Sequence, residues 1–242
     1  MPASATLLPQ SWNGWSWART GQLNIQVGSN VSAAWKPYLQ NSANTWSKTP
    51  NINYIVTAGK STGSACKASI GTVQVCNGNY GANGWLGYTT VWTSGGSIVQ
   101  ATIQFNDYYF QQPKYNNAAF RTYIACQEMG NALGLQDSDR IYTNANTGSC
   151  MDYTNDASGK VGTNGPLANI APSVSDFKNL AVIYANVGKT QLTQTKATGV
   201  YGNAFAAPAP EPASWLTMIA GFGVVGGALR RRKRMAPVTA AC

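Results

Sequence analysis

The segment that decides the fold reads Cys126-Gln-Glu-Met-Gly-Asn-Ala-Leu-Gly-Leu-Gln-Asp137. On a helix, Gln127 and Asn131 lie four residues apart and therefore share one face. Gly134 allows a sharp turn after the helix, which brings Asp137 back towards that face. We therefore expect Gln127, Asn131 and Asp137 to converge on one point, with Glu128 beside it.

A second part of the pattern follows downstream, where Cys150-Met-Asp-Tyr153 fits a tight turn. Together the two segments resemble the metzincin clan of zinc metalloproteases. The signature of that clan is His-Glu-x-x-His-x-x-Gly-x-x-His, or Asp at the last place, followed by a Met-containing turn beneath the metal. The matching frame in this chain is Gln127, Glu128, Asn131, Gly134, Asp137 and Met151.

A narrower resemblance is to a group of secreted zincin-like proteins whose first signature position is Gln. It covers roughly residues 20 to 190 and is carried by Ala-Cys-Gln-Glu-x-Gly, Gly-Ser-Cys-Met-Asp-Tyr, Val75-Cys-Asn and Gly84-Trp-Leu-Gly87. The resemblance implies that Gln127, Asn131 and Asp137 hold zinc and that Glu128 is the general base on the metal-bound water. It also implies structural roles for Gly134 and Met151.

The chain departs from this pattern because it contains no His. Asn131 replaces the central His, and amide oxygens are weak zinc donors compared with imidazole. Three interpretations follow. The first is a degenerate, non-catalytic domain kept as a binding or surface module, with no cofactor. The second is an active metal-dependent endopeptidase, in which zinc binds the attacking water and Glu128 is the general base. The third is an amphipathic helix that matches the motif by chance.

Hydrophobic patterning predicts an α/β (α+β) domain, a twisted mixed sheet backed by two long helices. Asn30 is expected to cap the first helix, and Ser94-Gly95-Gly96 predicts a hairpin. A polar loop is predicted at 137–148. The predicted strands are 22–28, 51–58, 72–76, 88–93 and 98–106, and the predicted helices are 31–46, 117–133 and 173–184.

Four of the five cysteines lie in the body of the chain. An even set predicts two disulfides in an oxidising compartment, and three pairings are compatible with the sequence. We favour Cys66–Cys76, which closes a short loop, together with Cys126–Cys150. The alternative is four buried free thiols.

The C-terminal segment carries a short motif of Pro210, Glu211 and Pro212, an uncharged stretch from Ala213 to Leu229 and the basic run Arg230–Arg234. As a helix the uncharged stretch is about 25 Å long, slightly short of a ~30 Å hydrocarbon core. Trp215 and snorkelling arginines make up the difference, and the basic run stays cytoplasmic.

This C-terminal pattern resembles the PEP-CTERM sorting signal of Gram-negative bacteria. The resemblance identifies Pro210, Glu211 and Pro212 as the sorting-signal residues. It implies processing near this motif by an exosortase, an inner-membrane intermediate, and then a place on the cell surface or in the biofilm matrix.

These signals divide the chain into five segments. Ala3-Ser4-Ala5 has the small-residue pattern of a signal-peptidase site, so residues 1–5 are expected to be the end of a signal peptide. The expected segments after it are a metzincin-like domain at 6–205, a linker at 206–212, a transmembrane helix at 213–229 and a cytoplasmic tail at 230–242.

Charge argues against nucleic acid as a partner. The formal net charge is +9, and removing the five charges of Arg230–Arg234 leaves +4 without a basic stripe. Charged residues make up 10% of the chain, against roughly 25% in an average domain. Such an uncharged polar surface is common in exported proteins.

Three weaker sites complete the prediction. The edge strand near Tyr88–Thr93, together with the helix at 117–133, can bind an extended peptide by strand addition. Trp12, Trp15 and Trp17 can stack on exopolysaccharide, although such spacing is also typical of half-buried packing. An oxygen-rich calcium site is the last, with the ligands Asp137, Asp139, Asn144, Asn146 and Asp152.

Overall fold

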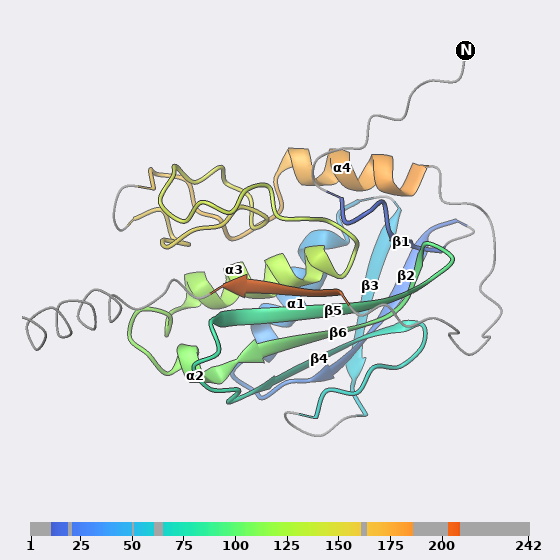
Figure 1. Ribbon diagram of the computed structural model, residues 1–242, viewed down its shortest axis with the longest axis horizontal. Coiled ribbons are helices and arrows are strands. Elements are labelled where there is room, and N and C mark those ends of the chain that lie inside the picture. Colours follow the sequence, from blue (N-terminus) through green and yellow to red (C-terminus); the bar gives the residue numbers. More distant parts are fainter. Residues whose placement is uncertain are drawn as a thin grey trace, which may run out of the picture. The chain divides into compact units, whose positions relative to one another are not determined.

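The computed structural model describes residues 11–18, 21–49, 51–60, 65–160 and 164–185, and the backbone of 203–208. Figure 1 shows a sheet with helices, which confirms the predicted α/β class. The elements in chain order are β1 (Ser16–Trp17), β2 (Leu23–Asn30), α1 (Lys36–Trp46), β3 (Ile52–Ala58), β4 (Thr72–Gly78), β5 (Trp85–Ser94), β6 (Ser97–Asn106), α2 (Asp107–Phe110), α3 (Ala118–Asn131), α4 (Val174–Ala185) and β7 (Asn203–Pro208).

The sheet is mixed, as predicted. Its strands lie in the order β3-β2-β4-β6-β5-β7, and β1 pairs with β6 outside this path. The pairs β2–β3, β2–β4 and β4–β6 are parallel, whereas β5 runs antiparallel to both β6 and β7. The predicted hairpin is confirmed, because β5 and β6 are joined by Gly95 and Gly96. The sheet is thus parallel at one side and antiparallel at the other.

Helices α1 and α3 pack side by side, and hydrogen bonds from α1 and β3 hold α3 in place. The Ser42 hydroxyl donates to the Ala125 carbonyl at 2.9 Å, and the Trp46 indole donates to the Cys126 carbonyl at 2.9 Å. From β3, the Tyr54 hydroxyl donates to the carbonyl of Met129 at 2.8 Å. Since these bonds are buried, the helix that carries the candidate site is held from two neighbouring elements.

The first long helix starts later than the sequence predicts. It begins at Lys36 without a side-chain cap, and Asn30 is instead the last residue of β2. Pro37 lies in the first turn, where its missing N–H and fixed φ are tolerated, so the helix starts there rather than at residue 31. Helix α3 was predicted more closely: Asn117 caps it by accepting from the Phe120 amide at 3.0 Å.

Residues 136–160 and 164–173 form an irregular lobe without a helix or strand. In Figure 1 its loops lie above α3 and to the left of α4. A disulfide between Cys126 and Cys150 joins the lobe to α3, and a second disulfide between Cys66 and Cys76 joins β4 to the loop before it. Both predicted pairings are therefore confirmed.

The C-terminal strand corrects one predicted boundary. β7 covers Asn203–Pro208, so residues 206–208, which were expected to begin a linker, pair with β5. The strand belongs to a compact unit formed by Met1–Ala209. Within the described part, no helix is long and apolar enough to cross a membrane.

Several predicted segments lie outside the described residues. They are the signal-peptide end at 1–5, the sorting-signal residues Pro210, Glu211 and Pro212, the expected transmembrane helix at 213–229 and the tail at 230–242. The structure therefore leaves the conformation of these segments as a prediction.

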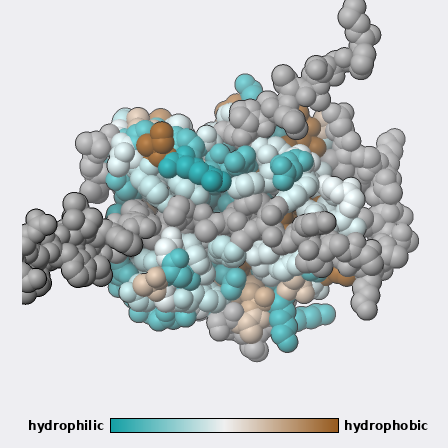
Figure 2. All heavy atoms as spheres, in the orientation of Figure 1, coloured by the Kyte–Doolittle hydropathy of each residue, from teal (hydrophilic) through white to brown (hydrophobic). Residues whose placement is uncertain are grey.

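The described surface offers no extended apolar area on the face shown in Figure 2, where brown atoms form small separate patches. A limited number of exposed large hydrophobic side chains is ordinary for a protein surface. In this chain they include Ile70, Ile141, Leu167, Ile170, Val174 and Val182.

Candidate functional site

Helix α3 presents the predicted site residues in its last two turns. Gln127 and Glu128 are 0% exposed and Asn131 is 2% exposed, while Asp137 from the following loop is 8% exposed. The Gln127 amide nitrogen lies 3.4 Å from Asp137 Oδ1. The structure therefore brings Gln127 and Asp137 together across the turn that ends the helix, in a place largely shielded from solvent.

The turn itself depends on Gly134. Its φ is +92°, a left-handed conformation that favours glycine, and a Cβ there would overlap the carbonyl oxygen of Trp15. Directly after it, the Leu135 amide donates back to the Gly130 carbonyl at 3.2 Å. Glycine at this position lets the chain reverse and return Asp137 towards Gln127.

Met151 lies against the same helix. Its sulfur is 2.5 Å from where a Cβ of residue 130 would stand, so the glycine at that position leaves room for it. The carbonyl of Met151 accepts from the Ser138 amide at 2.6 Å and from the Ser138 hydroxyl at 3.2 Å. The turn of Met151 is thus packed on α3 and bonded to the loop that carries Asp137.

Burial changes the acidity of Asp137. Desolvation raises the pKa of Asp137 to about 7, although a hydrogen bond from Tyr153 and the nearby Arg140 guanidinium act to lower it. The Arg140 Nε atom lies 3.9 Å from Asp137 Oδ2, and the Arg140 side chain is largely exposed. Asp137 is therefore about half protonated near neutral pH, unlike an ordinary carboxylate.

Tyr153 is a site residue that our sequence reasoning did not single out. It is 4% exposed, and burial followed by the charge of Asp137 raises its pKa far above the ordinary value. Its hydroxyl therefore stays protonated and donates to Asp137. The segment Cys150-Met-Asp-Tyr153 was recognised as a turn, but the contact of Tyr153 with Asp137 depends on how two loops fold together.

Glu128 is enclosed by β5. Thr89 Oγ1 donates to Glu128 Oε2 at 2.6 Å, and a Cβ on Gly87 would stand 2.6 Å from Glu128 Oε1. The backbone of β5 thus lies directly against the carboxylate. A general base must reach the water that it activates, whereas this carboxylate is buried and bonded to a threonine.

The donor set does not fit zinc. Gln127 Oε1 and Asn131 Oδ1 are buried acceptors with no donor, and the Gln127 amide nitrogen contacts the Asp137 carboxylate. Zinc sites in proteins use imidazole, thiolate and carboxylate ligands, and neutral amide oxygens are poor substitutes. Among the described residues, no group of three or more Cys, Asp and Glu side chains is placed to hold a metal.

Two other predicted sites, the tryptophan platform and the open edge of β5, differ in the structure from what the sequence predicts. Trp17 is 4% exposed and donates its indole N–H to the Ala132 carbonyl at 2.8 Å, while Trp12 and Trp15 pack half-buried on the core. These tryptophans are packing residues rather than an open platform. The edge of β5, expected to accept a peptide, pairs with β7 of the same chain in the register Thr89 to Phe205.

Comparison with known proteins identifies the C-terminal segment. Residues 208–233 match the PEP-CTERM protein-sorting motif. The matched range contains Pro210, Glu211 and Pro212, so the predicted sorting signal is confirmed as a sequence motif, although these residues lie outside the described structure. No curated protein matches the chain in sequence.

The structural neighbours are zinc metalloproteases. Myroilysin is similar with a TM-score of 0.39 and 13% identity over 71% of this chain and 82% of that one. A second myroilysin structure gives a TM-score of 0.37 and 14% identity over 76% and 88%. High choriolytic enzyme 1, a hatching-enzyme zinc protease of the medaka fish Oryzias latipes, gives 0.36 and 13% over 71% and 94%.

Proposed function

We propose that this chain is an exported cell-surface protein whose metzincin-like domain is a non-catalytic module. The observation that carries the proposal is the environment of Glu128, which is 0% exposed and accepts a hydrogen bond from Thr89. The adjoining amides of Gln127 and Asn131 are not ligands that hold zinc. Peptide hydrolysis requires both an activated water and a base that reaches it.

Export follows from the other end of the chain. The sorting motif at 208–233 is that of exported surface proteins of Gram-negative bacteria, and it implies an exosortase-type enzyme as a processing partner. The two disulfides agree with an oxidising compartment. We propose that the protein passes through an inner-membrane intermediate before it reaches the cell surface or matrix.

The test is to measure zinc and peptidase activity together on residues 6–209. We expect no stoichiometric zinc by elemental analysis and no cleavage of casein. Asn131→His restores one imidazole beside Gln127 and Asp137, so it should bind more zinc than the matched Asn131→Ala variant. Casein cleavage that is stopped by a chelator and by Glu128→Gln would show an active endopeptidase and refute the proposal.

A second candidate function is binding of a neutral polysaccharide on β5. The rings of Tyr80, Trp85 and Tyr88 are half-buried and contact one another with centroid distances of 5.2 and 5.4 Å. Gln104, on the adjacent β6, hydrogen-bonds to Tyr80. Aromatic rings next to amide side chains suit the apolar faces and hydroxyls of sugars. This set replaces the tryptophans at 12, 15 and 17 as the candidate platform.

Affinity electrophoresis in gels that contain exopolysaccharide tests this second candidate. Trp85→Ala and Tyr88→Ala should each abolish the retardation, because each removes a ring from the contact. Trp15→Ala is the matched control, since that ring is half-buried and packed against the core. Equal retardation of all three variants and the unaltered chain would rule out the rings of Tyr80, Trp85 and Tyr88 as a binding surface.

A further inference from the structure

The irregular lobe is held together by side-chain amides in place of a backbone ladder. The Asn146 amide donates to the carbonyls of Asp156 and Leu167 at 2.8 and 2.7 Å. The Asn164 amide donates to the carbonyls of Tyr142 and Asn144, both at 2.8 Å. A loop of this length without secondary structure is uncommon in a compact domain unless it carries a function.

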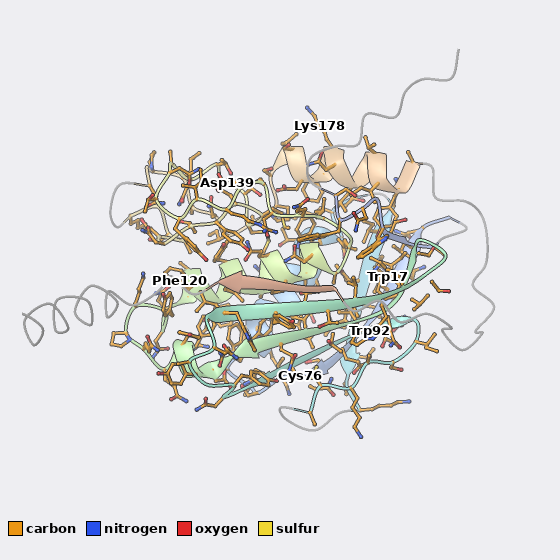
Figure 3. The ribbon with its side chains drawn as sticks, in the orientation of Figure 1. Trp17, Cys76, Trp92, Phe120, Asp139 and Lys178 are labelled. Atoms are coloured by element: carbon orange, nitrogen blue, oxygen red, sulfur yellow. A yellow bond between two sulfur atoms is a disulfide. The ribbon has the colours of Figure 1, made fainter. Side chains whose placement is uncertain are left out.

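Two carboxylates meet within this lobe. Asp139 and Asp152 are partners in an isolated parallel bridge, so their backbones run side by side. The Asn144 side-chain amide donates to Asp139 Oδ2 at 2.6 Å, so a third polar side chain lies beside the Asp139 carboxylate. Figure 3 labels Asp139 within the lobe. Residues that are separated in sequence are thus gathered into one oxygen-rich cluster.

No basic side chain neutralises this pair. The nearby Arg140 pairs with Asp137, and no Lys or Arg in the described part of the chain forms an ion pair with Asp139 or Asp152. Burial raises the pKa of Asp152, and contact with the Asp139 carboxylate raises it further. Two adjacent carboxylates repel each other. A cation bound between them offsets this repulsion because it attracts both.

Open ligand positions remain on the cluster. Asp152 is 0% exposed, and its Oδ2 accepts from the Thr147 amide and from the Asn169 side chain at 2.8 and 2.9 Å. In contrast, Asp152 Oδ1 and Asn144 Oδ1 are buried and have no donor. A buried acceptor without a partner is costly, so native structures usually fill such positions with water or an ion.

We propose that the oxygens of Asp139, Asn144 and Asp152 bind a divalent cation of the calcium class. Calcium takes six to eight oxygen ligands from carboxylates, amides and carbonyls with flexible geometry, which suits an irregular loop. Zinc prefers nitrogen and sulfur ligands. Two residues expected in this site lie elsewhere: Asp137 contacts Gln127 and Arg140, and the Asn146 amide binds backbone carbonyls.

The site joins the two segments that frame the candidate centre. Ser138, next to Asp139, bonds to the carbonyl of Met151, next to Asp152. A cation between the two aspartates therefore fastens the loop of Asp137 to the turn of Met151. Its role is to order the lobe, independently of any hydrolytic activity.

Calcium binding is tested on the full chain in detergent after treatment with a chelator. Addition of calcium to about 10 mM, enough to fill a site of the extracellular class, should raise the Tm by about 5 °C. The shift should be lost in Asp139→Asn and in Asp152→Asn. Asp156→Asn is the matched control: it changes another buried aspartate of the lobe and should keep the shift.

Terbium luminescence gives a second readout that does not depend on the stability of the variants. Tyr153 follows Asp152 directly, so bound terbium should be sensitised by tyrosine and displaced by calcium. Asn144→Ala, which leaves both carboxylates, should weaken binding about 10-fold. A wild-type chain without a Tm shift and without terbium luminescence refutes the site, as does a shift that survives both aspartate substitutions.

Discussion

The sheet with α1 and α3 and the irregular lobe bury their residues by different means. In the sheet and helices, most fully buried positions are apolar, such as Leu39 and Ile124, although Gln127 and Glu128 of the candidate site are fully buried as well. In the lobe, fully buried positions are often amides and carboxylates, such as Asn164, Asn169 and Asp152. One part is stabilised by the hydrophobic effect, and the other by polar groups that must each find a partner.

This difference predicts which part of the protein loses more stability on substitution. Apolar cores tolerate many exchanges of similar volume, whereas a buried polar network loses stability when any member is left without its partner. We therefore expect the lobe to open locally under changes that the sheet survives, and the following predictions test that division.

The largest effect is expected from the disulfide that crosses between the two parts. Replacing Cys126 and Cys150 by Ala should lower the free energy of unfolding by about 3 kcal/mol. Denaturant titration measures this loss, and limited proteolysis should show first cleavage within 138–160. Cys66→Ala with Cys76→Ala is the control; it should open the loop before β4 instead. First cleavage in the sheet of the Cys126 and Cys150 variant would contradict two separable parts.

The next effect concerns one amide of the lobe. The Asn169 side chain donates to Asp152 Oδ2 at 2.9 Å and accepts from the Gly148 amide at 3.0 Å. Asn169→Ala should cost about 2 kcal/mol, because it leaves buried groups without partners. Hydrogen exchange should report faster opening of the lobe alone. Asn53→Ala removes only an exposed bond to Asn24 in the sheet and should stay within about 0.5 kcal/mol.

An effect of pH is expected from Asp137. The pKa of Asp137 is about 7 in the fold and 3.8 in its ordinary state, so the folded chain binds the extra proton between these values. Its contribution to stability is complete at acid pH and is lost as pH rises to about 7. Measured with a chelator present, the Tm should fall from about pH 4 to about pH 7 and then level off. Asp137→Asn should remove most of this slope; Asp152, whose pKa is also raised, supplies the remainder.

The smallest effect is expected from the ion pair between Arg140 and Asp137 at the boundary of the two parts. The Arg140 side chain is 59% exposed, and its distance to Asp137 is 3.9 Å. Arg140→Ala should therefore change the free energy of unfolding by less than about 0.5 kcal/mol. It should nevertheless move the upper end of the pH transition to a higher value, because Arg140 lowers the pKa of Asp137. A transition that stays in place would show that the two groups are not coupled.

Local signals account for the parts of the fold that the sequence predicted well. The helix that starts near residue 117, the turn at Gly95 and Gly96 and the short-loop disulfide Cys66–Cys76 were predicted correctly because nearby residues decide them. Residues 206–208 of β7 were predicted to begin a linker, because a short Ala-rich segment ending in Pro becomes a strand only when an unpaired edge is available. That edge is β5, far away in the sequence.

The candidate site also combines features that the local sequence predicts with features that depend on distant residues. The approach of Asp137 to Gln127 follows from the helical spacing and the turn at Gly134. The enclosure of Glu128 does not, since it depends on Gly87 and Thr89 of a distant strand. The meeting of Asp139 with Asp152 also depends on a long-range bridge that no spacing rule provides.

The position at which β7 ends determines whether a cut near the sorting motif would leave this strand paired with β5. The strand ends at Pro208, and the motif of Pro210, Glu211 and Pro212 follows it closely. A cut within the motif releases a domain whose outermost strand is still paired. A cut only a few residues upstream would strip that strand away and bare a row of backbone donors and acceptors on β5, which recruits strands from other molecules.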